Sequence, residues 1–376
     1  MTNDSFAALS TISAELKRSA REASGDLATD TLISRAFCAL AFFEKDDKRL
    51  LPHLSGLPAI LECAPSEYGR RFIAAAIYSC GETDRLVDLS NAWVRYLLLP
   101  FKGNRSGFPP PSDLATSTYN AETAPSNGLD PLPSSRASNM TELVRLRDGY
   151  KCWATESYVY EHIPPGGVGA PLEVSHIIKR AVGVFNVQKD DGSLATWDII
   201  RHYTDWDAKR TQEVVEQLDT PLNGMLIIML LHPGWDDYAW TLKPVVGNND
   251  QAIPNTYEVE VLTPDEFPDL VLRKSDGTLV NRRVTFEDHG VKPDVQALVA
   301  KDGKINIKHQ RPLPDPDLIA LHRAISRVLH LSGAGEIIDS AFRKAEAAGI
   351  TVPSKKIRTT DELAMMLSCR AALRFF

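Results

Sequence analysis

Apolar residues recur at three- and four-residue intervals over the first part of the chain, which is the spacing of one face of an α-helix. The pattern is clearest over 32–43, 72–78 and 86–99. We therefore expect a helical N-terminal region over 1–100. Pro, Ser, Thr, Asn and Gly replace the large apolar residues over 101–139. Such a segment buries too little apolar surface to offset its loss of chain entropy, so it predicts a linker or an exposed loop.

Short apolar runs replace the helical spacing in residues 140–245. The runs over 172–174 and 225–231 have the length and composition of strands. Between them, 197–218 returns to the spacing of a helix, and 141–148 predicts a further short helix. This region is thus expected to contain strands separated by a helical insertion.

The last region, 246–376, opens with alternating apolar and polar residues over 257–261, which predicts a strand. A helical pattern follows over 317–330, with Gly333 and Gly335 as its expected stops. The role of this region cannot be inferred from its residues. Taken whole, the chain is expected to have an α+β fold: helical at the start, strands around a helical insertion in the middle, and a mixed C-terminal region ending in helices.

Charge and cysteine content restrict the function. The 376 residues carry a net charge of −7, and 141–245 holds 10 basic and 15 acidic side chains, a net charge of −5. This balance counts against nucleic-acid binding, which draws on positive charge. The five scattered cysteines show no CxxC spacing, so neither a disulfide framework nor a structural zinc site is predicted. With no signal-peptide or transmembrane pattern, we expect an intracellular protein, cytoplasmic or nuclear, without a membrane partner.

Three segments of the middle region carry residues suited to chemistry. Residues 147–155 read RDGYKCWAT, residues 172–178 read LEVSHII, and residues 223–236 read NGMLIIMLLHPGWD. Each has an ordinary explanation when taken alone: His176 as a half-buried histidine and Cys152 as a small buried side chain. Their order along the chain makes a joint function the better interpretation.

This arrangement resembles the HNH (His-Me finger, ββα-metal) endonuclease family over roughly 141–245, and the whole chain is similar to fungal proteins that contain an HNH nuclease domain. The resemblance implies a ββα-metal core over 140–245 and metal-dependent hydrolysis of phosphodiester bonds. His176 would be the general base that activates water, because the pKa of histidine lies near working pH. Asn223 would hold the histidine loop. The implied partner is a nucleic acid, DNA in the first place.

The same resemblance implies one divalent cation, Mg²⁺, Mn²⁺ or Zn²⁺, on His232 and Asp236. These residues are four apart and share one face if a helix begins there. An imidazole and a carboxylate suit any of the three metals. Many family members have a metal ligand where this chain has Ser175. Pro233 restricts the residue before it, so His232 is expected to cap the helix, and Asp237 is an alternative ligand.

Two other functions stay open. The same fold can serve a small-molecule substrate, which the acidic balance favours, or it can be a catalytically silent module used in assembly. Basic clusters at 273–274, 282–283 and 355–358 predict either a phosphate track or ordinary solvated surface. DNA and RNA cannot be told apart from the sequence, and neither the physiological metal nor the oligomeric state follows from it.

Overall fold

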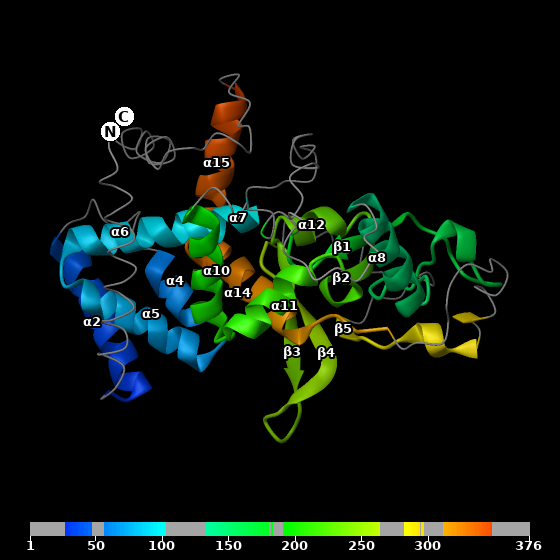
Figure 1. Ribbon diagram of the computed structural model, residues 1–376, viewed down its shortest axis with the longest axis horizontal. Coiled ribbons are helices and arrows are strands. Elements are labelled where there is room, and N and C mark those ends of the chain that lie inside the picture. The colour runs from blue at the N-terminus through cyan, green and yellow to red at the C-terminus, as the bar shows by residue number, and fades with distance from the viewer. Residues whose placement is uncertain are drawn as a thin grey trace, which may run out of the picture.

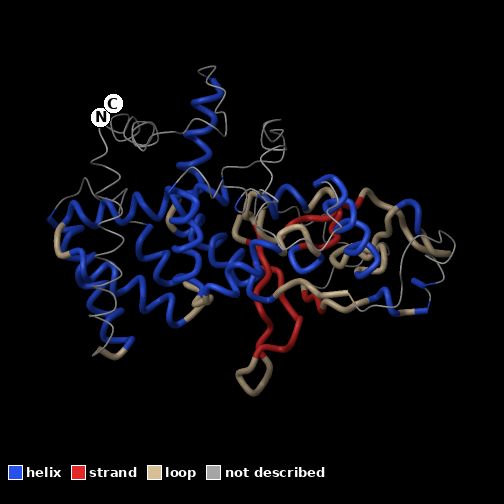
Figure 2. The backbone as a smooth tube through the Cα atoms, viewed as in Figure 1, coloured by secondary structure: helices blue, strands red, loops and turns tan. Residues whose placement is uncertain are grey.

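Helices gather at one end of the molecule, the strands lie near its middle, and loops and short helices form the opposite end (Figures 1 and 2). The computed structural model describes residues 27–46, 56–102, 133–179, 182, 191–263, 282–293, 295–296 and 311–347. Its helices and two small antiparallel sheets make a mixed α+β fold, so the expected fold class is confirmed. No helix in these ranges is long and apolar enough to cross a membrane.

The described parts of the N-terminal region, 27–46 and 56–102, are helical, with their apolar faces turned to a common core, and the rest of the predicted helical region lies outside the described residues. α5 shows how the sequence sets the ends: the Ser66 hydroxyl accepts from the Gly69 N–H at 2.8 Å, and Gly81 stops the helix with φ +62°. The helices are α2 (Thr29–Asp46), α4 (Gly56–Cys63), α5 (Glu67–Cys80), α6 (Thr83–Trp93), a π-helical turn (Val94–Leu98) and α7 (Leu99–Lys102).

The expected linker at 101–139 lies mostly outside the described residues. Its first two residues end α7, and 133–139 form the start of α8 (Pro133–Arg147). The short helix expected from Thr141 therefore begins earlier than predicted. Polar residues such as those at the start of α8 favour caps and turns over helix interiors, which is why the sequence pattern placed the start too late.

The two strands expected in the middle region pair with each other. β1 (Leu172–His176) and β2 (Gly224–Ile228) are antiparallel, with His176 opposite Gly224. A turn of 3₁₀-helix (Pro221–Asn223) leads into β2, and the five-residue α12 (His232–Asp236) follows it. In Figure 1, β1, β2 and α12 lie together beside α8.

The insertion forms two helices rather than the single one predicted. α10 (Asp191–Thr204) and α11 (Ala208–Glu216) are separated at Asp205, whose φ is +64°. α10 packs on α5, where a Cβ on Gly69 would collide with the Tyr203 carbonyl. The insertion therefore docks on the N-terminal helices, and only a glycine allows this approach.

Strand pairing crosses the boundary expected between residues 245 and 246. β3 (Trp240–Val246) pairs with β4 (Ala252–Val261), which pairs with β5 (Arg283–Thr285). α14 (Pro316–Leu331) packs on both β3 and α4, and α15 (Ala334–Ala347) follows it. The buried apolar side chains form one continuous cluster through these elements and the N-terminal helices.

The two glycines expected to stop the C-terminal helix differ in the structure. Gly333 follows the end of α14 with φ +68°, which confirms the predicted stop. Gly335 lies within α15, so its prediction as a stop was wrong. Gly333 alone ends α14 through its left-handed conformation, and Gly335 takes no part in this stop.

Candidate functional site

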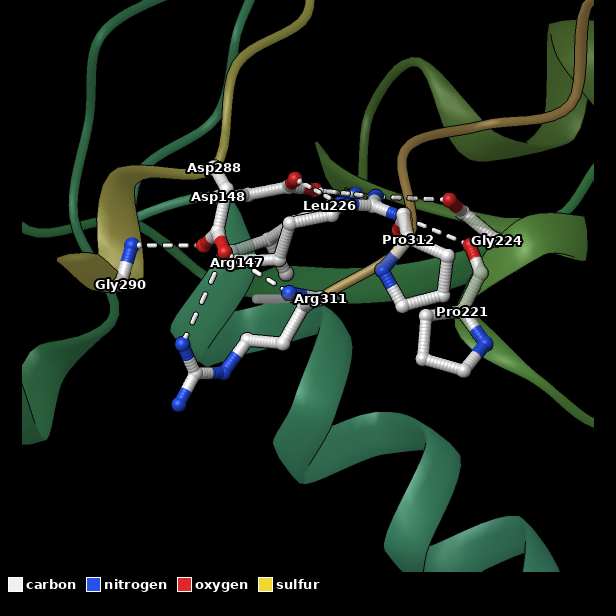
Figure 3. A network of polar contacts seen from close by, with 9 residues as sticks. All are labelled: Arg147, Asp148, Pro221, Gly224, Leu226, Asp288, Gly290, Arg311 and Pro312. Carbon is white, nitrogen blue, oxygen red and sulfur yellow. Dashed lines mark hydrogen bonds and ion pairs between the residues drawn. The ribbon is translucent and has the colours of Figure 1, made fainter. Parts of the chain in front are cut away.

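The edge of β2 that faces away from β1 is paired with the residues that end α8 (Figure 3). The fully buried Arg147 guanidinium donates to the Gly224 carbonyl at 2.7 Å and to the Pro221 carbonyl at 2.6 Å. Asp148 accepts from the Leu226 N–H at 2.8 Å and receives Arg147 on its two oxygens at 2.6 and 3.0 Å. A buried ion pair matched by backbone groups in this way avoids most of its desolvation cost.

Cys152 continues this pairing along the same edge. Its Sγ accepts from the Ile228 N–H at 3.3 Å, two residues beyond the one that Asp148 binds. The chain reaches this position because Gly149 and Tyr150 both take left-handed conformations, with φ +67° and +57°. The RDGYKC segment thus builds the strand, and its cysteine is an acceptor as well as a buried side chain.

A second buried pair ties the C-terminal region to this network (Figure 3). Asp288 accepts from the Gly290 N–H at 2.9 Å and from the Arg311 N–H at 2.8 Å. The next residue, Pro312, offers its carbonyl to Arg147 at 3.3 Å. Residues on both sides of the expected 245/246 boundary therefore support the same strand.

Asn223 holds the segment after β1 through its carboxamide. Its Oδ1 accepts from the Ile178 N–H at 2.8 Å, and its Nδ2 donates to the carbonyls of Ile178 and Leu218, both at 2.9 Å. The side chain is completely buried. These bonds hold the backbone that follows His176, the segment that the resemblance implies Asn223 would hold.

His176 lies at the end of β1 with its imidazole partly exposed. Its Nε2 is 3.4 Å from Oδ1 of Asp219, a residue in the turn after α11 that the sequence did not single out. This is an ion-pair distance, and a proton on Nε2 would face the carboxylate, with Nδ1 as the other ring nitrogen. The His176 carbonyl accepts from the Trp235 indole at 3.0 Å, which links β1 to α12.

His232 lies between two carboxylates. Its Nδ1 is 2.6 Å from Oε2 of Glu173 on β1, and its Nε2 is 3.6 Å from Oδ2 of Asp236 on α12. His232 is the first residue of α12 with Leu231 as its N-cap, so its expected place as the cap was wrong by one residue. Pro233 fits the first turn, where a backbone N–H has no partner within the helix.

Asp237, the alternative ligand, faces a different group. The buried Lys102 ammonium donates to the Asp237 carbonyl at 3.1 Å and lies 3.5 Å from its carboxylate. The same ammonium is 3.2 Å from the Asp339 carboxylate on α15. Asp236 therefore lies beside His232, whereas Asp237 lies beside Lys102.

The donors around His232 fit a cation held by two protein ligands. Two ligands at about 2.1 Å from one ion lie about 3.0–3.4 Å apart in octahedral or tetrahedral geometry, slightly less than the 3.6 Å between His232 Nε2 and Asp236 Oδ2. Glu173 then occupies the outer position that carboxylates take behind a metal-bound histidine. Ser175 is completely buried, with its hydroxyl 3.5 Å from the His176 carbonyl. Among the described residues, no three His, Cys, Asp or Glu side chains converge in a way that could hold a metal.

The local charge is negative around α12. Burial, with Asp236 and Asp237 close by, raises the pKa of Tyr238 well above its usual value. Of the three basic clusters, only Arg282 and Arg283 lie in the described part of the chain, exposed at the start of β5.

Comparisons with protein-family models, with curated proteins and with solved structures found no match, so the geometry alone supports the interpretation of this site.

Proposed function

We propose that this chain is a metal-dependent HNH-type endonuclease that hydrolyses phosphodiester bonds, with His176 as general base and one divalent cation on His232 and Asp236. The observation that supports it most is the arrangement around β1. Glu173 on this strand contacts His232, and His176 ends the strand with its carbonyl bonded to Trp235 of α12. The proposed base is thus part of β1, and one of the proposed cation ligands, His232, contacts the same strand.

The chemistry of the proposed step follows from the tautomer of His176. With the proton on Nε2 toward Asp219, Nδ1 accepts a proton from water as the water oxygen attacks phosphorus. The Asp219 carboxylate stabilises the imidazolium that forms. The bond from phosphorus to the leaving oxygen breaks, and that oxygen takes a proton from solvent. A bound divalent cation supplies Lewis-acid stabilisation of the charge that develops on the phosphate and leaving oxygens.

The test is cleavage of supercoiled plasmid and of single-stranded DNA and RNA with Mg²⁺, Mn²⁺ or Zn²⁺, using wild type and His176→Ala. The matched control is His202→Ala, since His202 lies on α10 and pairs with Asp198 at 3.6 Å. We expect metal-dependent cleavage by wild type and by the control, and none by His176→Ala. Equal absence of cleavage in all three proteins with every metal and substrate would contradict the proposal.

A second candidate is hydrolysis of a small phosphodiester, and the charge of the middle region favours it. The net charge of −5 over residues 141–245 repels a polyanion more than a small monoanionic diester. The probe is bis(p-nitrophenyl) phosphate, assayed with the same three proteins. Turnover that depends on His176 without any nucleic-acid cleavage would assign the site to a small substrate.

A further inference from the structure

His322 is a buried titratable side chain that the proposed mechanism does not use. It lies on α14, is 1% exposed, and stacks on Trp235 with ring centroids 3.6 Å apart and planes within 3°. Trp235 is the residue whose indole N–H binds the His176 carbonyl at 3.0 Å. One stacked pair therefore lies between α14 and the end of β1.

The ring of His322 is held in one tautomer. Its Nε2 is 3.4 Å from the Trp235 carbonyl, which can only accept, so Nε2 carries the proton. Its Nδ1 is 3.2 Å from the Thr241 hydroxyl on β3 and 3.4 Å from the Ser326 hydroxyl. Ser326 already donates to the His322 carbonyl at 2.8 Å, which leaves Thr241 as the donor to Nδ1.

These contacts do more than fill space. A phenylalanine could stack on Trp235 equally well, but it could not bond the Trp235 carbonyl or the Thr241 hydroxyl. The imidazole therefore fixes the backbone and the indole of Trp235 together, against both α14 and β3. Burial also lowers the pKa of His322 to about 3, so the ring stays neutral and keeps this tautomer at neutral pH.

We propose that His322 is a positioning residue of the candidate site, which sets the orientation of His176 by holding the Trp235 indole against the His176 carbonyl. This rests on the proposed function for its catalytic consequence, but not for its structural one. It gives the C-terminal region a role: α14 supplies the support beneath α12 and the end of β1.

The structural part is tested by NMR on the full chain, through hydrogen exchange of the Trp235 indole N–H, assigned with Trp235→Phe. In wild type this proton is expected to exchange slowly. His322→Phe keeps an aromatic ring that can stack on Trp235 but loses the hydrogen bonds to the Trp235 carbonyl and the Thr241 hydroxyl. Exchange is therefore expected to accelerate at least about tenfold. His322→Gln is the second variant, since its amide keeps a donor for the Trp235 carbonyl. Ile73→Ala on α5 is the control for a general loss of stability.

The catalytic part is tested by the cleavage rate of the same proteins. We expect kcat to fall about 10- to 100-fold in His322→Phe with KM unchanged, because small displacements of catalytic groups cost that much. Ile73→Ala should retain the wild-type kcat when assayed below its unfolding transition. Fast exchange of the Trp235 N–H in wild type, or exchange in His322→Phe at the wild-type rate, would overturn the proposal. A wild type without activity would instead contradict the proposed function, because the exchange measurement does not depend on cleavage.

Discussion

The two sides of the β1–β2 pair carry polar clusters of opposite character. On the outer edge of β2, Arg147 and Asp148 are almost completely buried, and their charges are matched by each other and by backbone groups. On the other side, His176, His232 and Asp236 are partly exposed. His176 lies 3.4 Å from Asp219 and His232 lies 3.6 Å from Asp236, both longer than good hydrogen bonds, while His232 has a close contact of 2.6 Å with Glu173.

This difference distinguishes residues that stabilise the fold from residues that we propose to take part in the reaction. A buried ion pair with matched bonds has no protonation change or free coordination position to offer a substrate. A partly exposed imidazole beside a carboxylate has both a proton to exchange and access to solvent. The three segments singled out in the sequence, 147–155, 172–178 and 223–236, therefore contain both residues that support β2 and residues that we propose to react.

The largest expected effect on stability comes from disrupting the buried Arg147–Asp148 pair. Arg147→Met should lower the free energy of unfolding by about 3–5 kcal/mol, because it leaves the Asp148 carboxylate buried without its partner. Denaturant unfolding measures this change. Arg145→Ala is the control: it removes a neighbouring arginine whose pair with Glu142 at 3.5 Å is partly exposed, and it should cost no more than about 1 kcal/mol. Equal losses in the two variants would remove the distinction between the clusters.

The second prediction concerns the pH dependence of stability that buried His322 contributes. The folded-state pKa of His322 is about 3, below the unfolded value of about 6.5, so its contribution to stability is complete above pH 6.5 and is lost as pH falls toward 3. Between pH 6.5 and 4 this amounts to about 3 kcal/mol. Unfolding measured across this range should show a shallower acid dependence in His322→Phe than in wild type. Parallel curves would contradict the assignment.

A smaller effect on stability is expected at Glu173, which contacts the proposed cation ligand His232. Glu173→Gln should change the free energy of unfolding by less than about 1 kcal/mol, because Glu173 is 41% exposed. It should weaken Mn²⁺ binding about 10- to 100-fold, since it removes the carboxylate behind His232. Isothermal titration calorimetry measures the affinity, with Glu142→Gln as the control for charge. Unchanged affinity would show that Glu173 does not support a metal ligand.

Much of the fold could be predicted from local pattern. Helical periodicity located α2, α5, α6 and α14, and two apolar runs located β1 and β2, because burial imposes these periods directly. The division of the insertion into α10 and α11 was missed because a left-handed aspartate at 205 leaves no strong signal. The strand β3 was not predicted, and the boundary expected at 245/246 therefore falls within it.

The candidate site was only partly predictable. His176, Asn223, His232 and Asp236 lie in short segments that stand out, and the structure brings His232 and Asp236 together. Asp219 lies outside these segments. Glu173 lies within the 172–178 segment, but its role depends on His232, which only the fold places beside it.

The central claim is that His176 is a reactive group and not part of the support. The most direct measurement is the single-turnover rate of cleavage of an end-labelled oligonucleotide at saturating Mn²⁺, for wild type and His176→Ala, with the unfolding midpoint of each protein. We expect the variant to lose at least about 100-fold in rate, as removal of a general base does, while its unfolding midpoint stays near that of wild type. A variant that cleaves at the wild-type rate, or that loses activity only because it unfolds, would contradict the account.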